Sequence, residues 1–141
     1  EFIEKRIAEL NIDPSRIIFE LTETAAFVNL DEVQHFMRRI KNLGCQFALD
    51  DFGVGFSSFY YIKQLNFDYL KIDGSFIAKL ANNPNDQVFV RAMVEISRVF
   101  GLTVIAEWVE DKETADMLRS YGVRFGQGYY FGKPLPMPDQ E

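Results

Sequence analysis

Five short apolar runs alternate with helical patterns along this chain, and that alternation restricts its fold more than any other feature. Each run is rich in β-branched and aromatic residues and delivers a polar or charged residue at or near its carboxyl end. Strands that alternate with helices are typical of a parallel sheet, because parallel strands need a long crossover connection. We therefore expect an α/β fold with five parallel strands at residues 16–23, 46–51, 69–73, 102–107 and 123–127.

The segments between these runs carry helical faces with recognisable ends. Asn29 and Glu32 have the spacing of a capping box at the start of one helix. The apolar faces within residues 33–43, 89–100 and 115–121 are each followed at once by a glycine. Glycine at that position adopts the left-handed conformation that turns the chain into the next strand. A further helix is expected over residues 1–10.

Residues 47–58, FALDDFGVGFSS, place two adjacent carboxylates at the end of an apolar run, before a glycine-containing loop. Taken alone, Asp50 and Asp51 before glycine are equally typical of a turn. Oxygen ligands beside a closely folded backbone also suit a divalent cation. Functional groups gather at the carboxyl ends of parallel strands. We expect convergence there of six residues: Glu20, Asp50, Asp51, Lys71, Glu107 and Gln127.

Composition excludes several other functions. The net charge of −6 and pI of about 4.8 argue against a general DNA- or RNA-binding surface. The single cysteine, Cys45, lies in an apolar run and is expected to be a buried, reduced thiol. No apolar run approaches the roughly 18 residues that could enter a bilayer, and no signal-peptide pattern occurs. We expect a cytoplasmic protein without direct membrane insertion.

Five motifs resemble the EAL-domain family, bacterial phosphodiesterases that hydrolyse cyclic di-GMP. They are ELTE (20–23), DDFGVGFSS (50–58), LKID (70–73), AEWVE (106–110) and QGYYFGKPLP (127–136). The resemblance implies a TIM-type (βα) barrel, which typically needs about 250 residues. Because this chain has 141 residues, we expect residues 1–141 to be the C-terminal portion of one EAL domain, with the N-terminal part of the barrel absent.

The resemblance also implies a function and its cofactors. The intact domain is expected to hydrolyse cyclic di-GMP to linear pGpG with two Mg²⁺ or Mn²⁺ ions, and Ca²⁺ is expected to inhibit. The family's Glu-Ala-Leu motif does not occur in this sequence, so we expect the chain alone to be inactive. The alternative is a degenerate EAL domain that senses cyclic di-GMP or binds a partner protein. A different Mg²⁺-dependent phosphoryl-transfer barrel is a further alternative from the residues alone.

On the family's scheme, Glu20 and Asp50 would bind one ion, and Asp50 would bridge to a second ion that also meets Asp51. Glu107 would be a ligand of the second ion or the general base. Lys71 would hydrogen-bond the attacking water or the phosphate. An alternative for Lys71 is that it projects from an edge strand.

The resemblance gives three further residues supporting roles. Glu23 would anchor the loop of residues 50–58, and Glu110 and Gln127 would contact the metal ions through water. Glu110 equally suits a helix N-terminus, where a carboxylate interacts well with the helix dipole. Asp73, before a glycine, is expected to be a turn or cap residue.

The chain departs from the family pattern at Val54, Phe56 and Trp108, where the family usually has Thr, Tyr and Gly. Trp108 adds a large ring at the mouth of the barrel, where it would stack on a guanine or obstruct it. The resemblance implies upstream sensor or GGDEF-type domains, in a cytoplasmic protein or the cytosolic part of a membrane-tethered one. Open barrel edges predict self-association.

Overall fold

The structure is a computed structural model that describes residues 2–22, 24, 25, 29–53 and 59–136. Its five strands form one parallel sheet in the order β1-β2-β3-β4-β5, so each strand lies beside its neighbour in the sequence. The strands are β1 (Ile18–Thr22), β2 (Gln46–Phe52), β3 (Tyr69–Ile72), β4 (Thr103–Ala106) and β5 (Phe125–Gly126). The predicted α/β fold with five parallel strands is confirmed.

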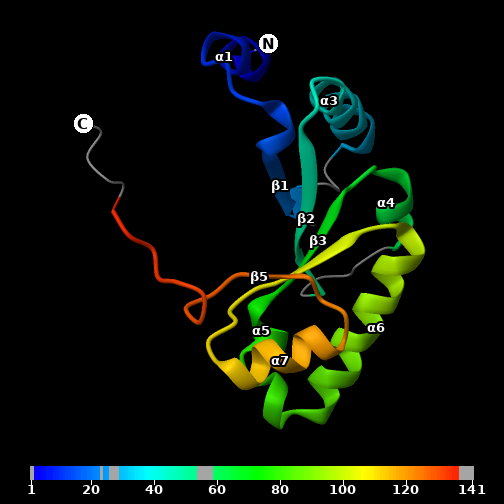
Figure 1. Ribbon diagram of the computed structural model, residues 1–141. Coiled ribbons are helices and arrows are strands. Elements are labelled where there is room, and N and C mark those ends of the chain that lie inside the picture. The colour runs from blue at the N-terminus through cyan, green and yellow to red at the C-terminus, as the bar shows by residue number, and fades with distance from the viewer. Residues whose placement is uncertain (1, 23, 26–28, 54–58, 137–141) are drawn as a thin grey trace.

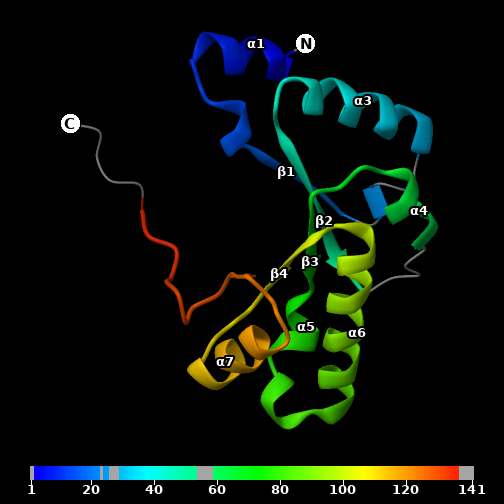
Figure 2. The same cartoon turned by 45° about the vertical axis from the view of Figure 1, so that its right-hand side comes forward.

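Helices fill the intervals between the strands, and α4 and α6 lie on the same side of the sheet (Figures 1 and 2). Asn29 accepts a hydrogen bond from the backbone N–H of Glu32 at 3.3 Å, as the capping pattern predicts. Gly101 ends α6 with a φ of +69°. The helical elements are α1 (Phe2–Glu9), η1 (Pro14–Arg16), α3 (Leu30–Asn42), α4 (Phe59–Gln64), α5 (Gly74–Ile77), η2 (Leu80–Asn82), α6 (Pro84–Phe100) and α7 (Lys112–Ser120).

One face of the sheet forms the hydrophobic core with the helices. Successive side chains of a strand point to opposite faces, so residues two apart share a face. Phe47 and Leu49 of β2 are paired with Phe19 and Leu21 of β1, and the core continues through β3 and β4. The strand residues that are buried on this face are Phe47, Leu49, Leu70, Ile72, Val104 and Ala106.

The opposite face of the sheet carries the polar residues. Glu20 is paired with Ala48, two residues before Asp50, and Ala48 is paired with Tyr69, two residues before Lys71. The register therefore puts Glu20, Asp50 and Lys71 on one face near the carboxyl ends of their strands. Lys71 is in turn paired with Ile105, two residues before Glu107. The predicted convergence of these residues follows from the strand register.

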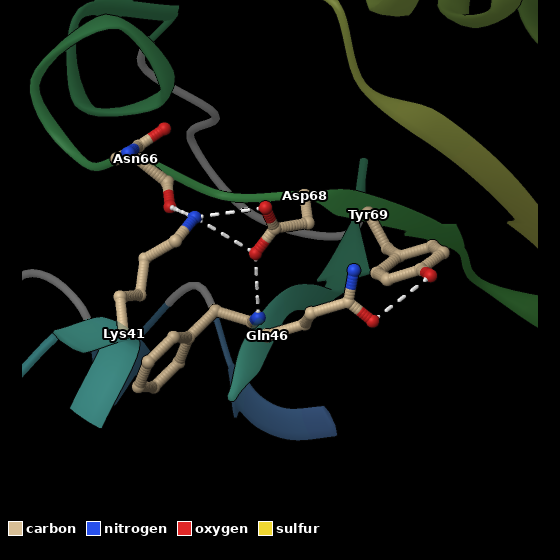
Figure 3. Close-up of polar contacts among 6 residues, drawn as sticks. Lys41, Gln46, Asn66, Asp68 and Tyr69 are labelled. Carbon is tan, nitrogen blue, oxygen red and sulfur yellow. Dashed lines mark hydrogen bonds and ion pairs between the residues drawn. The ribbon is translucent and has the colours of Figure 1, made fainter. Parts of the chain in front are cut away.

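The two ends of the sheet differ in their polar chemistry. At the amino ends of β2 and β3, Lys41 Nζ donates to the Asp68 carboxylate and to the carbonyl of Asn66, all at 2.8 Å (Figure 3). The same carboxylate accepts the N–H of Phe47 at 2.9 Å. Charge and hydrogen bonds are balanced within this cluster, which is typical of a structural role.

We predict that Asp68→Ala lowers the free energy of unfolding by about 1–3 kcal/mol, because it leaves the Phe47 N–H without its acceptor and removes the carboxylate that balances the Lys41 charge. Chemical denaturation measures the change. The control is Asp116→Ala, which removes an exposed carboxylate that pairs with Lys112 and Arg119 on α7 and should leave stability nearly unchanged. Equal losses in the two variants would contradict a structural role for Asp68.

The predicted burial of Cys45 is confirmed, and burial raises the pKa of its thiol. His35 on α3 is exposed. Among the described residues, no helix is both long and apolar enough to span a membrane.

Both outer strands of the described sheet have an open side. Within the described residues, β1 pairs only with β2, and β5 pairs only with β4. Ile18 on β1 is 41% exposed and Phe125 on β5 is 50% exposed. Unpaired backbone groups beside apolar side chains favour pairing with another strand.

We therefore predict that the 141-residue chain self-associates in solution. The open backbone groups of β1 and β5 would pair with strands of a second copy. Size-exclusion chromatography coupled to light scattering tests this prediction over a range of protein concentrations. A single monomeric species at every concentration would contradict it.

Candidate functional site

Lys71 lies at the centre of the carboxylates that the strand register gathers. Its ammonium is 2.7 Å from Glu107 Oε1, 2.9 Å from Glu20 Oε2 and 3.1 Å from Asp50 Oδ1. The side chain is only 4% exposed, and β3 is the central strand of the sheet. The alternative that Lys71 projects from an edge strand is therefore wrong.

The environment keeps Lys71 charged. Burial by itself would lower the pKa of Lys71, but the hydrogen bonds that its ammonium donates to Glu107, Glu20 and Asp50 outweigh it, and the pKa is raised above the ordinary value. The ammonium therefore cannot serve as a proton acceptor at physiological pH. Its chemistry is that of a fixed positive charge and hydrogen-bond donor.

Glu107 experiences the opposite balance. Burial raises the pKa of Glu107, and the nearby charges of Asp50 and Asp73 act in the same direction, while Lys71 opposes them. A carboxylate with a raised pKa accepts a proton more readily than an ordinary one.

A break in β2 brings Asp51 to the same site as Asp50. In a regular strand, neighbouring side chains point to opposite faces, which would send Asp51 toward the helices. The register between β2 and β3 shifts between Leu49 and Phe52, and Asp51 has a φ of +56°. Asp51, Asp50 and Glu107 each offer an oxygen within 4.8 Å of the others. This bulge therefore converts two consecutive aspartates into one set of ligands.

Gly53 holds the end of this bulge against the helices. A Cβ atom at position 53 would lie 2.8 Å from Phe89 Cζ and 3.1 Å from Phe76 Cε2, and its φ is +102°. The rings of Phe76 and Phe89 stack with their centroids 4.1 Å apart. Close packing of a glycine on this aromatic pair fixes where the segment after Asp51 leaves the sheet.

The other wall of the site is a turn locked onto the chain after β4. The carbonyl of Ala106 accepts the N–H of Gln127 at 2.8 Å, and the carbonyl of Gln127 accepts the N–H of Val109 at 3.0 Å. The carbonyl of Val109 in turn accepts the N–H of Tyr130 at 3.0 Å. A Cβ at Gly128 would lie 2.3 Å from the Val109 carbonyl oxygen, so glycine is required for this approach.

A pocket of about 450 Å³ opens between residues 107–110, which follow β4, and the turn of residues 127–129. Its lining residues are Glu107, Trp108, Glu110, Gln127, Gly128 and Tyr129. Trp108 has a φ of +51°, a conformation that costs a non-glycine residue roughly 1–3 kcal/mol. Trp108 follows the end of β4 by two residues and, like Asp51, has a left-handed backbone conformation.

The structure brings together most of the residues that the sequence singled out. Glu20, Asp50, Lys71 and Glu107 meet directly, with Asp51 beside them. Glu110 and Gln127 line the adjoining pocket. The carboxylate that caps α7 is Asp111, whose side chain accepts the N–H of Thr114. Glu23 lies outside the described residues, as do Val54 and Phe56.

Sequence reasoning missed two features of the site. Tyr129 belongs to a quoted motif, but no role was assigned to it, although an aromatic residue after a glycine at a strand end is a usable signal. Asp73 caps α5 by accepting the N–H of Ser75, which confirms the cap expected at this position, but the close contact of Gly74 with Trp108 is not predicted. No pattern in the sequence marks that close approach.

The donor set fits hard divalent cations. All ligand atoms in the cluster of Asp50, Asp51 and Glu107 are carboxylate oxygens, which suit Mg²⁺, Mn²⁺ and Ca²⁺ better than softer metals. A single ammonium faces three carboxylates, with Asp51 adding a fourth. The remaining negative charge favours binding of a cation, because partly buried charges need compensation.

Comparison with known proteins identifies the family. The family model of the EAL domain matches residues 1–134. The chain is 40% identical over 137 residues to the cyclic di-GMP phosphodiesterase PdeB of Shewanella oneidensis, a match that covers 97% of this chain and 16% of PdeB. This chain belongs to the EAL domain family.

Solved structures agree with this assignment. The PaMucR phosphodiesterase in complex with c-di-GMP matches with a TM-score of 0.89 and 32% identity, over 96% of this chain and 55% of that one. BlrP1 of Klebsiella pneumoniae, solved with manganese and cyclic di-GMP, matches with a TM-score of 0.87 and 27% identity, over 94% of this chain and 34% of that one. The fold is that of EAL domains, which are TIM-like barrels.

We predict that Lys71→Met makes stability depend on divalent cations. Without the ammonium, the carboxylates repel one another, and the free energy of unfolding in cation-free buffer should fall by up to about 3–5 kcal/mol, less where solvent screens the half-exposed Glu20. Mn²⁺ should raise the melting temperature of this variant more than that of the wild type, because binding to the folded state stabilises it.

Thermal unfolding at several Mn²⁺ concentrations and constant ionic strength measures this dependence. Lys79→Met is the matched control, because Lys79 is exposed and the substitution is the same. Identical responses of the wild type and Lys71→Met to Mn²⁺ would show that the ammonium and the cation do not balance the same charges.

Proposed function

We propose that the intact domain containing this chain hydrolyses cyclic di-GMP to linear pGpG in a reaction that depends on divalent metal ions. The observation that carries the proposal is the cluster of Glu20, Asp50 and Glu107 around the Lys71 ammonium. The name of PdeB and the c-di-GMP complex of PaMucR support the substrate. The chain spans 16% of the length of PdeB, so the activity of a whole protein remains a proposal.

The proposed ligands divide between two cations. Glu20 and Asp50 would hold the first cation, and Asp50, Asp51 and Glu107 would hold the second. Bound there, Mg²⁺ or Mn²⁺ would polarise the phosphodiester and lower the pKa of a water molecule. The proximity of the Asp50, Asp51 and Glu107 oxygens supports this division. Ca²⁺ should bind but inhibit, because it accepts a longer and more flexible coordination shell than Mg²⁺.

The protein side chains carry the rest of the reaction. The Lys71 ammonium donates to a phosphate oxygen or to the attacking water, and it offsets negative charge as that charge develops. Glu107 accepts a proton from the water, a role that its raised pKa supports. The water oxygen forms a bond to phosphorus as the bond from phosphorus to the ribose oxygen breaks, and the ribose oxygen takes up a proton, which opens the ring and leaves a linear dinucleotide. Glu110 and Gln127 hold water beside Glu107.

The second candidate is a domain that binds cyclic di-GMP or a partner protein without hydrolysis. The absence of the Glu-Ala-Leu motif from these 141 residues favours this candidate for the chain alone, and we expect the chain alone to lack appreciable activity. The retained carboxylates favour the enzyme for the intact domain. Attached sensor or GGDEF-type domains and a cytoplasmic location stay predictions.

We predict that Asp50→Asn in the intact domain abolishes Mg²⁺-dependent hydrolysis of cyclic di-GMP, because a bridging ligand without its charge weakens both cations. Chromatographic separation of cyclic di-GMP from pGpG measures turnover, and circular dichroism checks that the variant is folded. Asp116→Asn, an exposed carboxylate on α7, is the matched control and should keep full activity. Turnover by Asp50→Asn near the wild-type rate would refute the assignment.

A further inference from the structure

Trp108 has three features for which the proposed hydrolysis provides no reason. Its φ is +51°, the residue is 59% exposed, and it directly follows Glu107 in the chain. Because the indole is mostly exposed, burial of apolar surface does not offset the strained backbone conformation. Strain that persists beside a functional site is a reason to look for a function of the residue that carries it.

The indole lies against the backbone of Gly74 and is fixed there. A Cβ atom at position 74 would be 2.2 Å from Cγ and 2.3 Å from Cδ2 of Trp108. Only glycine therefore allows the ring to lie so close to the first residue of α5. That backbone is itself held, because Asp73 caps α5 by accepting the N–H of Ser75 at 2.9 Å. One part of the ring is thus immobilised while the rest faces the pocket.

The pocket connects the indole to the carboxylate cluster. Glu107 is common to both, since it contacts Lys71 in the cluster and lines the pocket with Trp108 and Tyr129. Tyr129 is 58% exposed and adds a second aromatic side chain. A phosphodiester held at the cluster would therefore extend its neighbouring groups into a pocket of about 450 Å³ with aromatic lining.

We propose that Trp108 stacks on a nucleobase of the bound phosphodiester and sets the affinity for the substrate, an inference that rests on the proposed function. A pre-positioned, exposed aromatic ring next to a phosphate-binding cluster is the arrangement on which bases stack in nucleic-acid-binding proteins. Fixing the ring on Gly74 lowers the entropy lost when the base binds. The alternative is that the indole obstructs the pocket, in which case removing the ring would tighten binding.

The direct test is the intrinsic fluorescence of the intact domain, read as the part of the emission that Trp108→Gly removes, because Trp108 is the only tryptophan of the 141-residue chain. Cyclic di-GMP is titrated in the presence of Ca²⁺, with isothermal calorimetry on the same samples, and dimethyl phosphate serves as a phosphodiester without a base. We expect cyclic di-GMP to change the emission at the concentrations that calorimetry gives for binding, and dimethyl phosphate to leave it unchanged. Binding without a change in emission, or no calorimetric binding, overturns the inference.

Two variants separate the ring from its position. Trp108→Gly removes the ring and relieves the backbone strain, so it should weaken binding of cyclic di-GMP by roughly tenfold or more without weakening Mn²⁺ binding or lowering the melting temperature. Gly74→Ala keeps the ring but displaces it and should also weaken binding. The matched control is Gly132→Ala, because no atom lies within 4 Å of a Cβ at position 132. Tighter binding by Trp108→Gly would mean that the indole obstructs the pocket, which overturns the inference.

Failure of this inference can be told apart from failure of the proposed function. In the intact domain, pGpG production with an unchanged KM in Trp108→Gly would leave the hydrolysis in place and reject the role of Trp108. Ligand-dependent emission without any pGpG would support the role of Trp108 and reject the hydrolysis. A raised KM with an unchanged kcat in Trp108→Gly supports both.

Discussion

The contact between the Lys71 ammonium and three carboxylates is the interaction on which the site depends. Glu20 of β1, Asp50 of β2 and Glu107, directly after β4, reach one nitrogen atom. Like charges at this separation would repel one another, and the ammonium allows β1, β2 and the end of β4 to keep their register. Because one positive charge does not balance three negative ones, the same contact leaves an attraction for cations. Structural stability and metal chemistry therefore have a common origin here.

Two departures from strand geometry add further groups to this centre. Asp51 and Trp108 both have positive φ angles, and each follows a residue of the Lys71 cluster. In a regular strand the side chain of Asp51 would point toward the helices, where a carboxylate would be costly to bury. Its left-handed conformation brings a carboxylate oxygen within 4.8 Å of oxygens of Asp50 and Glu107, whereas the ring of Trp108 lies against Gly74 of α5 and Trp108 lines the adjoining pocket. Local strain therefore coincides with candidate functional groups at one end of the sheet.

The sequence predicts the features that arise from local patterns and not those that arise from packing between distant segments. Strand positions, helix ends at Asn29 and Gly101, and the convergence of Glu20, Asp50 and Lys71 depend on periodicity and capping, which are local and readable. The conformation of Trp108 and its contact with Gly74 depend on tertiary packing between distant segments. The sequence predicts Asp51 as a candidate ligand from its place beside Asp50 at the end of a strand, but the left-handed conformation that brings it to the site is not readable from alternation.

The sheet carries two charged clusters, and the candidate functional site is the one whose charges are not balanced. At the amino ends, Lys41 meets one carboxylate, Asp68, whose oxygens also accept the Phe47 N–H. At the carboxyl ends, Lys71 meets an excess of carboxylates. A balanced cluster gains nothing from an added cation, whereas an unbalanced one does. The sheet can hold the unbalanced cluster in place because its apolar face and its amino end already fix the strands, which leaves the carboxyl ends available for binding.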